Sequence, residues 1–158
     1  MGTFDIYGKL IEPVGKALQS DPRFGTLKIF YDRTAERAVP SEIMPAMNYF
    51  LESPWQDINR GSGSFSIQTR QMRVRLGFAI WCYSSKSEAD LDDQLFGFSS
   101  DLLDWFREHT EFDQVNGIFL DVNTQIDFDV DYQQGDNNAF VGTQKLSVPF
   151  LMYSGSGK

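Results

Sequence analysis

The stretch QMRVRLGFAIWCY, residues 71 to 83, alternates between an apolar set of side chains and a mixed set. The apolar set occupies every second position: Met72, Val74, Leu76, Phe78, Ile80 and Cys82. The mixed set comprises Arg73, Arg75, Gly77, Ala79, Trp81 and Tyr83. Because successive side chains of a strand point to opposite faces of a sheet, the pattern predicts a long strand with one face in the core.

Other segments are also typical of strands, because they alternate or are short and apolar. They are residues 26–32, 43–53, 117–132 and 140–154. Pro45 cannot donate to a strand ladder, so the second of these segments is expected at a sheet edge, or is expected to begin after the proline. Breaker residues predict loops between them, at 33–42, 54–64 and 133–139.

Two segments have helical spacing instead. Residues 4–21 place apolar side chains four apart, and Pro13 is expected to kink this helix or split it. Residues 85–109 form the second predicted helix, which begins with a Ser87 and Asp90 pair of capping-box type. Its apolar stripe is Leu91, Leu95, Phe98, Leu102 and Phe106.

The order of elements is helix, strands, helix, strands, without regular βαβ alternation. This order predicts an α+β fold, a mostly antiparallel sheet with two main helices packed on one face. The chain has 158 residues, which favours a single domain. We expect that domain to span residues 1–153 and residues 154–158 to form a flexible tail.

Charge and composition exclude several classes of function. The net charge is −8 and the pI is near 4.5, which argues against nucleic-acid binding. A single cysteine and a single histidine cannot form an internal disulfide or a common zinc site. The N-terminal residues lack the apolar run of a signal peptide, and we expect no membrane span.

The stretch QIDFDVDY, residues 125–132, places Asp127, Asp129 and Asp131 at alternate positions. A calcium loop would need glycine where Tyr132 stands and a glutamate where Asn138 stands. On a strand the three carboxylates would be roughly 6.8 Å apart in a row, too spread to chelate one small cation. They also lack the different environments of a catalytic acid–base pair. We therefore expect a solvated strand face with no metal, cofactor or catalytic residue; a hydrolase that uses this row is the rival hypothesis.

Charges of opposite sign occupy different segments of the chain. Residues 58–87 contain no acid, and residues 110–144 contain no lysine or arginine. One interpretation is cross-strand pairing within one sheet. The other is a head-to-tail contact between subunits, basic strand against acidic strand, which would close a ring. The candidate residues for such an interface, or for a channel lumen, are Arg70, Arg73, Arg75, Asp127, Asp129 and Asp131, and Trp55 is a candidate exposed contact.

The segment VPSEIMPAMNYFLESPW, residues 39–55, precedes a loop rich in Gly and Ser, the arginine-bearing strand and a helix that starts with acids. In this order the sequence resembles the tail-terminator, or tail completion, proteins of long-tailed bacteriophages. The resemblance covers most of the chain. It rests on a Pro-Ala-x-Asn motif, here Pro45, Ala46 and Asn48, with the acid Glu52 soon after it.

The resemblance implies a structural virion protein without enzymatic activity. It would form a hexameric ring that caps the tail tube, stops tube polymerisation and joins the tube to the head-side connector. Its partners would be further copies of itself, the tail-tube protein, a connector or neck protein and a sheath protein. DNA would pass through without specific binding. The protein would assemble in the host cytoplasm and lie at the head-proximal end of the tail. A phage neck or minor tail adaptor protein, or a small non-enzymatic binding module, is the alternative.

Overall fold

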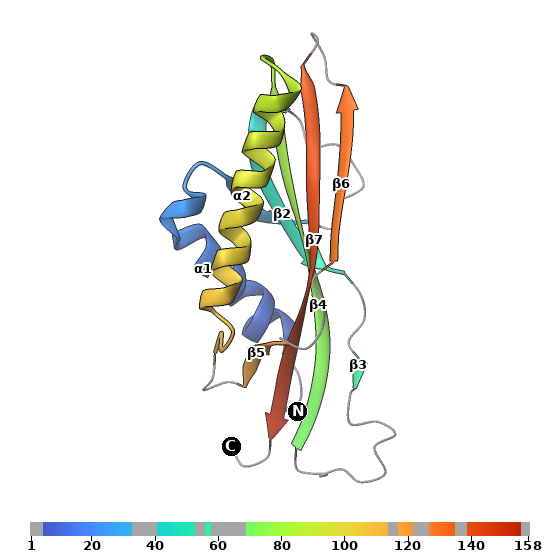
Figure 1. Ribbon diagram of the computed structural model, residues 1–158. Helices are drawn as coiled ribbons and strands as arrows, with labels where there is room; N and C mark the ends of the chain where they lie inside the picture. The colour runs from blue at the N-terminus through green and yellow to red at the C-terminus, as the bar shows by residue number, and fades with distance from the viewer. Residues whose placement is uncertain are drawn as a thin grey trace.

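Two long strands form the centre of the structure, β4 (Thr69–Ser84) and β7 (Phe140–Gly155). They pair antiparallel along their whole length, from Thr69 opposite Gly155 to Ser84 opposite Phe140. In the computed structural model they run the length of the molecule (Figure 1). The structure describes residues 5–32, 41–52, 56–57, 69–113, 117–121, 127–134 and 139–155.

The remaining strands extend this pair on both sides. The order across the sheet is β1-β2-β4-β7-β5, with β3 on β4 and β6 on β7. β1 and β2 are parallel, and the other pairs are antiparallel. The bounds are β1 Lys28–Tyr31, β2 Ala46–Leu51, β3 Gln56–Asp57, β5 Ile118–Leu120 and β6 Asp127–Gln134.

Helices α1 (Glu12–Ser20) and α2 (Glu88–Glu108) pack on one face of this sheet, so the predicted α+β fold is confirmed. A π-helical turn, Tyr7–Ile11, leads directly into α1, where Pro13 lies in the first turn. The Glu12 amide donates to the Tyr7 carbonyl, five residues before it, and Pro13, which has no amide hydrogen, comes directly after this wide turn. The helical run therefore continues through Pro13, with a change from π to α geometry just before it. Short 3₁₀ turns occupy Pro22–Phe24 and Ser41–Ile43.

The main core lies between the sheet and the two helices. The apolar set of β4 is fully or almost fully buried, as its alternation predicts. The stripe of α2 packs onto it, except that Phe98 is only partly buried. From α1 and its π turn come Leu10, Val14 and Leu18. Each such side chain contributes about 1.5–3 kcal/mol when buried fully.

The opposite face of the sheet carries a smaller apolar cluster. Its buried members are Met44, Ala46, Phe50, Ala79, Trp81 and Val141. The ring of Phe50 lies on Gly77, where any Cβ would overlap it. Trp81 Nε1 donates to Asn48 Oδ1 at 2.8 Å, so the buried indole and amide satisfy each other. The mixed set of β4 is therefore partly core as well.

Four sequence-based boundaries differ from the structure. β2 begins directly after the cis peptide Met44–Pro45, as one alternative predicted, but it lies between two strands rather than at an edge. β3 lies inside the expected loop 54–64. The segment 117–132 contains two strands, β5 and β6, which pair with different parts of β7. β7 continues to Gly155, so the expected tail begins two residues too early.

Candidate interaction surface

The arginines of β4 bind partners within the chain. Arg73 Nε donates to Asp121 Oδ2 at 2.8 Å, and the Asp121 carboxylate is buried. Arg75 Nη1 donates to Ser147 Oγ at 2.7 Å and to the Ser147 carbonyl at 3.2 Å. Arg73 is therefore already paired with a carboxylate of its own chain, and Arg75 is hydrogen-bonded to a neutral residue of its own chain.

Ser147 links Arg75 to a second group of charges on the same face. The Ser147 hydroxyl donates to the Glu52 carboxylate. Lys145 Nζ lies 3.0 Å from Glu52 Oε2 and 5.6 Å from the centre of the Phe50 ring. Sequence reasoning missed Lys145, although its phase with Ser147 on the last strand places both on the face that carries the arginines.

Asp129 and Asp131 are exposed on β6, opposite Lys145 and Thr143 of β7. They share a sheet face with Arg73 and Arg75, but β7 lies between the two rows, which puts β4 and β6 about 10 Å apart. β6 also starts opposite Ser147, whereas Arg75 is opposite Pro149, further along β7. The structure therefore shows no direct pairing of Asp129 or Asp131 with Arg73 or Arg75.

Three further candidates are described in part or not at all. The backbone of Arg70 lies on β4 opposite Ser154, and the backbone of Asp127 lies on β6 opposite Ser147. Their side chains, and all of Trp55, are outside the described residues.

Two apolar residues of β6 are exposed, contrary to expectation. Val130 is 36% exposed and Tyr132 is 52% exposed, although both were predicted to face the core. The alternation itself is present, because the Tyr132 hydroxyl reaches α2 and donates to Asp92 Oδ1 at 2.9 Å. Burial fails because β6 pairs only with β7 among the described strands, while α2 packs mainly over β4 and β7.

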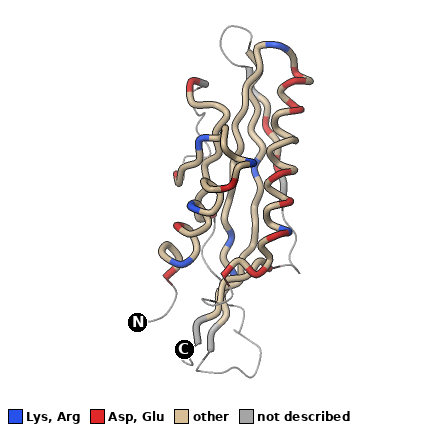
Figure 2. Tube along the Cα trace, turned by 90° about the vertical axis from the view of Figure 1, so that its left-hand side faces the viewer, with Lys and Arg blue, Asp and Glu red and all other residues tan. Residues whose placement is uncertain are grey.

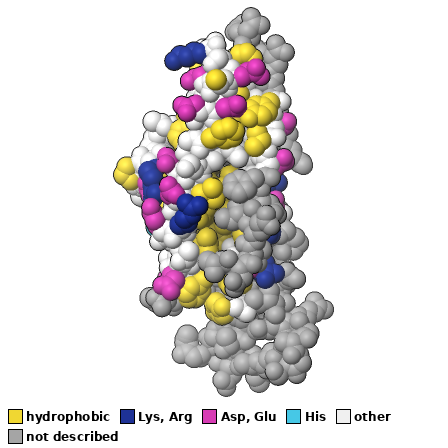
Figure 3. All heavy atoms as spheres, in the orientation of Figure 1, with side chains coloured by type: hydrophobic (Ala, Val, Ile, Leu, Met, Phe, Trp, Pro, Cys, Tyr) yellow, Lys and Arg dark blue, Asp and Glu magenta, His cyan; other side chains and the backbone are white. Residues whose placement is uncertain are grey.

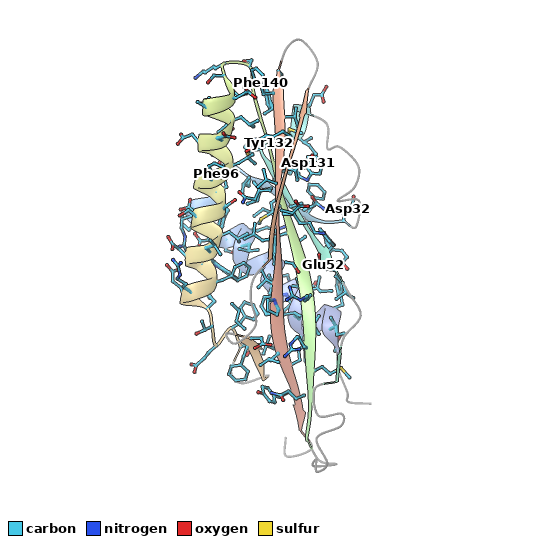
Figure 4. All side chains as sticks on the ribbon, turned by 45° about the vertical axis from the view of Figure 1, so that its right-hand side comes forward. Asp32, Glu52, Phe96, Asp131, Tyr132 and Phe140 are labelled. Atoms are coloured by element: carbon cyan, nitrogen blue, oxygen red, sulfur yellow. The ribbon has the colours of Figure 1, made fainter. Side chains whose placement is uncertain are left out.

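Phe96 extends this exposed area onto α2. It is 49% exposed and lies one turn after Asp92, so it is on the same side of the helix. We refer to Phe96, Val130 and Tyr132 as the β6 patch. Figure 3 shows hydrophobic side chains gathered over the upper part of α2 and the neighbouring strand, among acidic ones, and Figure 4 places Phe96 and Tyr132 on these two elements.

Acidic residues of α2 border the β6 patch. They are Glu88, Asp92 and Asp93, whereas Asp129 and Asp131 lie on the opposite face of β6. The hydrogen bond to Asp92 raises the pKa of Tyr132, so this phenol stays protonated and keeps donating at neutral pH. An apolar centre with an acidic rim would suit a partner surface that has an apolar centre and basic groups around it.

Cys82 and His109, the side chains outside this surface that could react, both pack as structural residues. Burial raises the pKa of Cys82 to about 12, as suits a small core residue. His109 Nδ1 lies 2.7 Å from the Trp105 carbonyl, and its ring stacks on Trp105. Within the described residues, no group of three or more His, Cys, Asp or Glu side chains could hold a metal ion. Among the described helices, none is long and apolar enough to cross a membrane.

The motif behind the phage resemblance has a structural role in this fold. Ala46 starts β2 directly after Pro45, and Asn48 is buried between the Trp81 indole and the carbonyl of Asp32. Glu52 follows β2 and joins Lys145 and Ser147. No family model matches the chain, and a search of curated proteins finds no significant match. Its function is therefore inferred from its own residues and from the order of its motifs.

Proposed function

We propose that this chain is a structural phage protein of the tail-terminator type. It forms a ring, hexameric by resemblance, that caps the tail tube, stops its polymerisation and joins it to the head-side connector. The observation that carries the proposal is the edge of the sheet at β6. Within the described chain β6 pairs with β7 on one side, and it borders an exposed aromatic patch.

An open strand edge beside exposed aromatic side chains is a surface that favours association. Soluble proteins usually protect such edges with charges, covering loops or very short strands. Here β6 has eight residues, and it presents Asp129 and Asp131 on one face and Val130 and Tyr132 on the other. The acids oppose random stacking of edges, while the aromatic side supports a specific contact. This combination would suit a protein that works as a ring.

The acidic character also fits a channel for DNA. The net charge of −8 and the exposed acids of β6 would repel phosphates, so DNA would slide past without adhering. The acids and the β6 patch lie on opposite faces of the same strand. One face can therefore meet a neighbouring subunit while the other remains hydrated.

The oligomeric state tests this proposal first. We expect size-exclusion chromatography with light scattering to give one closed oligomer of about six chains, and negative-stain electron microscopy to show rings. When the protein is added to polymerising tail-tube protein, it should shorten the tubes. A chain that stays monomeric alone and on tubes, and leaves tube length unchanged, would contradict the proposal and favour a monomeric binding module.

A further inference from the structure

The two outermost strands, β1 and β6, each pair with one neighbour among the described strands. β1 pairs with β2 and β6 pairs with β7, so four strand spacings, about 19 Å, separate the two edges. Figure 2 looks onto the face that carries the helices, with the N-terminal helical region at one side and α2 at the other. Each edge presents backbone groups with which a strand of another chain could pair.

On the β1 edge, a side chain occupies one of these backbone groups. The Lys28 amide donates to the Pro45 carbonyl at 3.1 Å, toward β2. Because neighbouring residues of a strand direct their backbone groups to opposite sides, those of Ile29 point to the open edge. There Gln19 Nε2 donates to the Ile29 carbonyl at 3.0 Å. Gln19 is exposed, so its side chain can leave this carbonyl to an amide of a neighbouring strand.

The register of the sheet places β1 and β6 in the same rows. The row that begins at Lys28 on one edge ends at Asp131 on the other. Its members between the edges are Ala46, Trp81 and Thr143. The next row begins at Ile29 and ends at Val130. The two edge strands are therefore at the same height along the sheet.

The side chains of the two edges match on both faces of the sheet. On the face without helices, Lys28 is exposed at one edge and Asp131 is exposed at the other. On the face that carries the helices, the ring of Tyr31 contacts the exposed ring of Tyr7, and Val130 is exposed at the opposite edge. A charge on one edge thus corresponds to an opposite charge on the other, and an apolar surface to an apolar surface.

The strand directions permit the two edges to pair between copies. β6 is antiparallel to β7, β7 to β4 and β4 to β2, whereas β1 is parallel to β2, so β1 and β6 run in opposite directions. A rotation about an axis along the strands keeps the helices of all copies on the same face, and it would bring β6 antiparallel to β1 of the next copy. A closed ring involves no translation along its axis, so matching rows stay at the same height.

We propose that β6 of one copy pairs edge to edge with β1 of the next copy, with Asp131 beside Lys28 of that copy. This inference rests on the proposed function, because it names the two edges that would close the ring. A second β6 edge is a poorer partner, since it would place acids against acids. The pair of Lys28 and Asp131 stays exposed, so it selects the partner edge, while backbone hydrogen bonds and the apolar contact on the helix-bearing face supply most of the affinity.

A disulfide between the two edges tests the contact directly. The variant carries Lys28→Cys and Asp131→Cys, both at exposed positions. Within one chain these positions are about 19 Å apart, whereas a disulfide needs Cα atoms within about 7 Å. Oxidation should therefore link different chains. Non-reducing electrophoresis should show a ladder of products that ends at the closed ring and collapses to single chains on reduction.

Matched cysteine variants control for random collision. Glu111→Cys with Asp131→Cys keeps two exposed thiols but moves one to the segment after α2, so it should give no ladder. Cys82 is buried and should not take part. Asp131→Cys alone should stay unlinked. A linked dimer of that single variant would show that two β6 edges meet, and it would overturn the pairing of β6 with β1.

Exchange of the two charges tests the pair without a covalent bond. Lys28→Glu and Asp131→Lys should each raise, by about tenfold, the protein concentration at which half of the rings dissociate. A variant with both changes should return to within about threefold of the wild type, because opposite charges meet again. Circular dichroism would verify that all three variants fold. Single reversals that leave this concentration unchanged would contradict the placement of Lys28 beside Asp131.

The outcomes separate this inference from the proposed function. If the wild type forms rings but the double-cysteine variant gives no ladder, the edge pairing is wrong and the ring function stands. If linked rings form but tail tubes keep their length, the edge pairing stands and the tail-terminator function fails. If the wild type is monomeric alone and on tubes, both fail.

Discussion

Two glycines in helical segments have opposite roles, which only their surroundings reveal. Gly15 of α1 is buried against the Tyr49 ring, and a Cβ there would lie 2.6 Å from Tyr49 Cζ. Gly97 of α2 faces open space. Nothing in the local sequence separates them, because each follows an apolar or aromatic residue within a helical pattern. The close approach of α1 to β2 therefore depends on Gly15 lacking a side chain.

Alanine substitutions should change stability in opposite directions. Gly15→Ala should lower the free energy of unfolding by about 1–3 kcal/mol, because Tyr49 must move within the core. Gly97→Ala should raise it by about 0.5–1 kcal/mol through helix propensity. Urea denaturation measures both, at a protein concentration at which light scattering shows monomers, so that assembly does not contribute. If Gly15→Ala stabilises the protein, the packing of α1 on Tyr49 is wrong.

At the scale of elements, the attachment of α2 depends on a few polar contacts that join it to distant segments. Ser99 Oγ lies 2.6 Å from Gln144 Oε1 of β7, and both residues are buried. At the other end of the helix, Arg23 binds Asp21 and Glu108 at 2.7 and 2.8 Å. These contacts fix the helix along the strands, where apolar packing alone would tolerate a shift.

The Arg23 contact should make stability depend on pH in the acidic range. Hydrogen bonds from Arg23 lower the pKa of Asp21 and of Glu108 below their ordinary values of 3.8 and 4.5. The carboxylates therefore add stability above those values and lose it as the pH falls through the lowered pKa values. Arg23→Ala should lower the melting temperature at pH 7, and its difference from the wild type should shrink as the pH falls below about 4.5.

Arg107→Ala is the matched control for this pH series. Arg107 Nη1 binds Asp104 at 2.9 Å, but the pair is exposed and lies within a single helix turn. Such pairs contribute little to stability, so the melting temperature should change less than for Arg23→Ala. A constant difference between wild type and Arg23→Ala from pH 7 to pH 3 would show that the Arg23 contact does not act through these carboxylates.

At the scale of the whole molecule, acids of α2 border the β6 patch, and assembly through that patch should respond to salt. Exposed charges are screened over about 10 Å at 0.1 M salt and over about 3 Å at 1 M. We therefore expect salt to weaken the oligomer. In about 0.5 M sodium chloride it should dissociate at a higher protein concentration than in about 0.05 M. Glu88→Gln with Asp93→Asn should flatten this dependence, because two exposed acids beside the patch are neutralised.

Light scattering over a dilution series at both salt concentrations measures this effect. Glu111→Gln is the control, since it removes one exposed acid outside the rim. If the affinity between subunits rises with salt concentration, apolar contact alone holds the subunits together. In that case Phe96 and Tyr132 would be retained in the interface and the charge argument discarded.

The periodicity of apolar residues along the chain was sufficient to predict the class of fold and most of the core residues. The alternation of residues 71–83 and the stripe of α2 depend on local geometry, which is the same in any strand or helix. The α+β arrangement followed from the order of these elements. The phase of Asp129 and Asp131 was also correct, since both are exposed on β6.

Neighbour relations between distant segments required the tertiary structure. Periodicity shows which residues share a face, but not whether a helix covers that face or which strand lies alongside. Val130 and Tyr132 are therefore exposed despite their apolar phase, because β6 pairs only with β7 among the described strands and α2 packs mainly over β4 and β7. Arg73 and Arg75 are bound within the chain because β7 brings Ser147 beside them and Asp121 follows β5. Burial and charge pairing are properties of contacts that the fold makes across the sequence, so they were decided only in three dimensions.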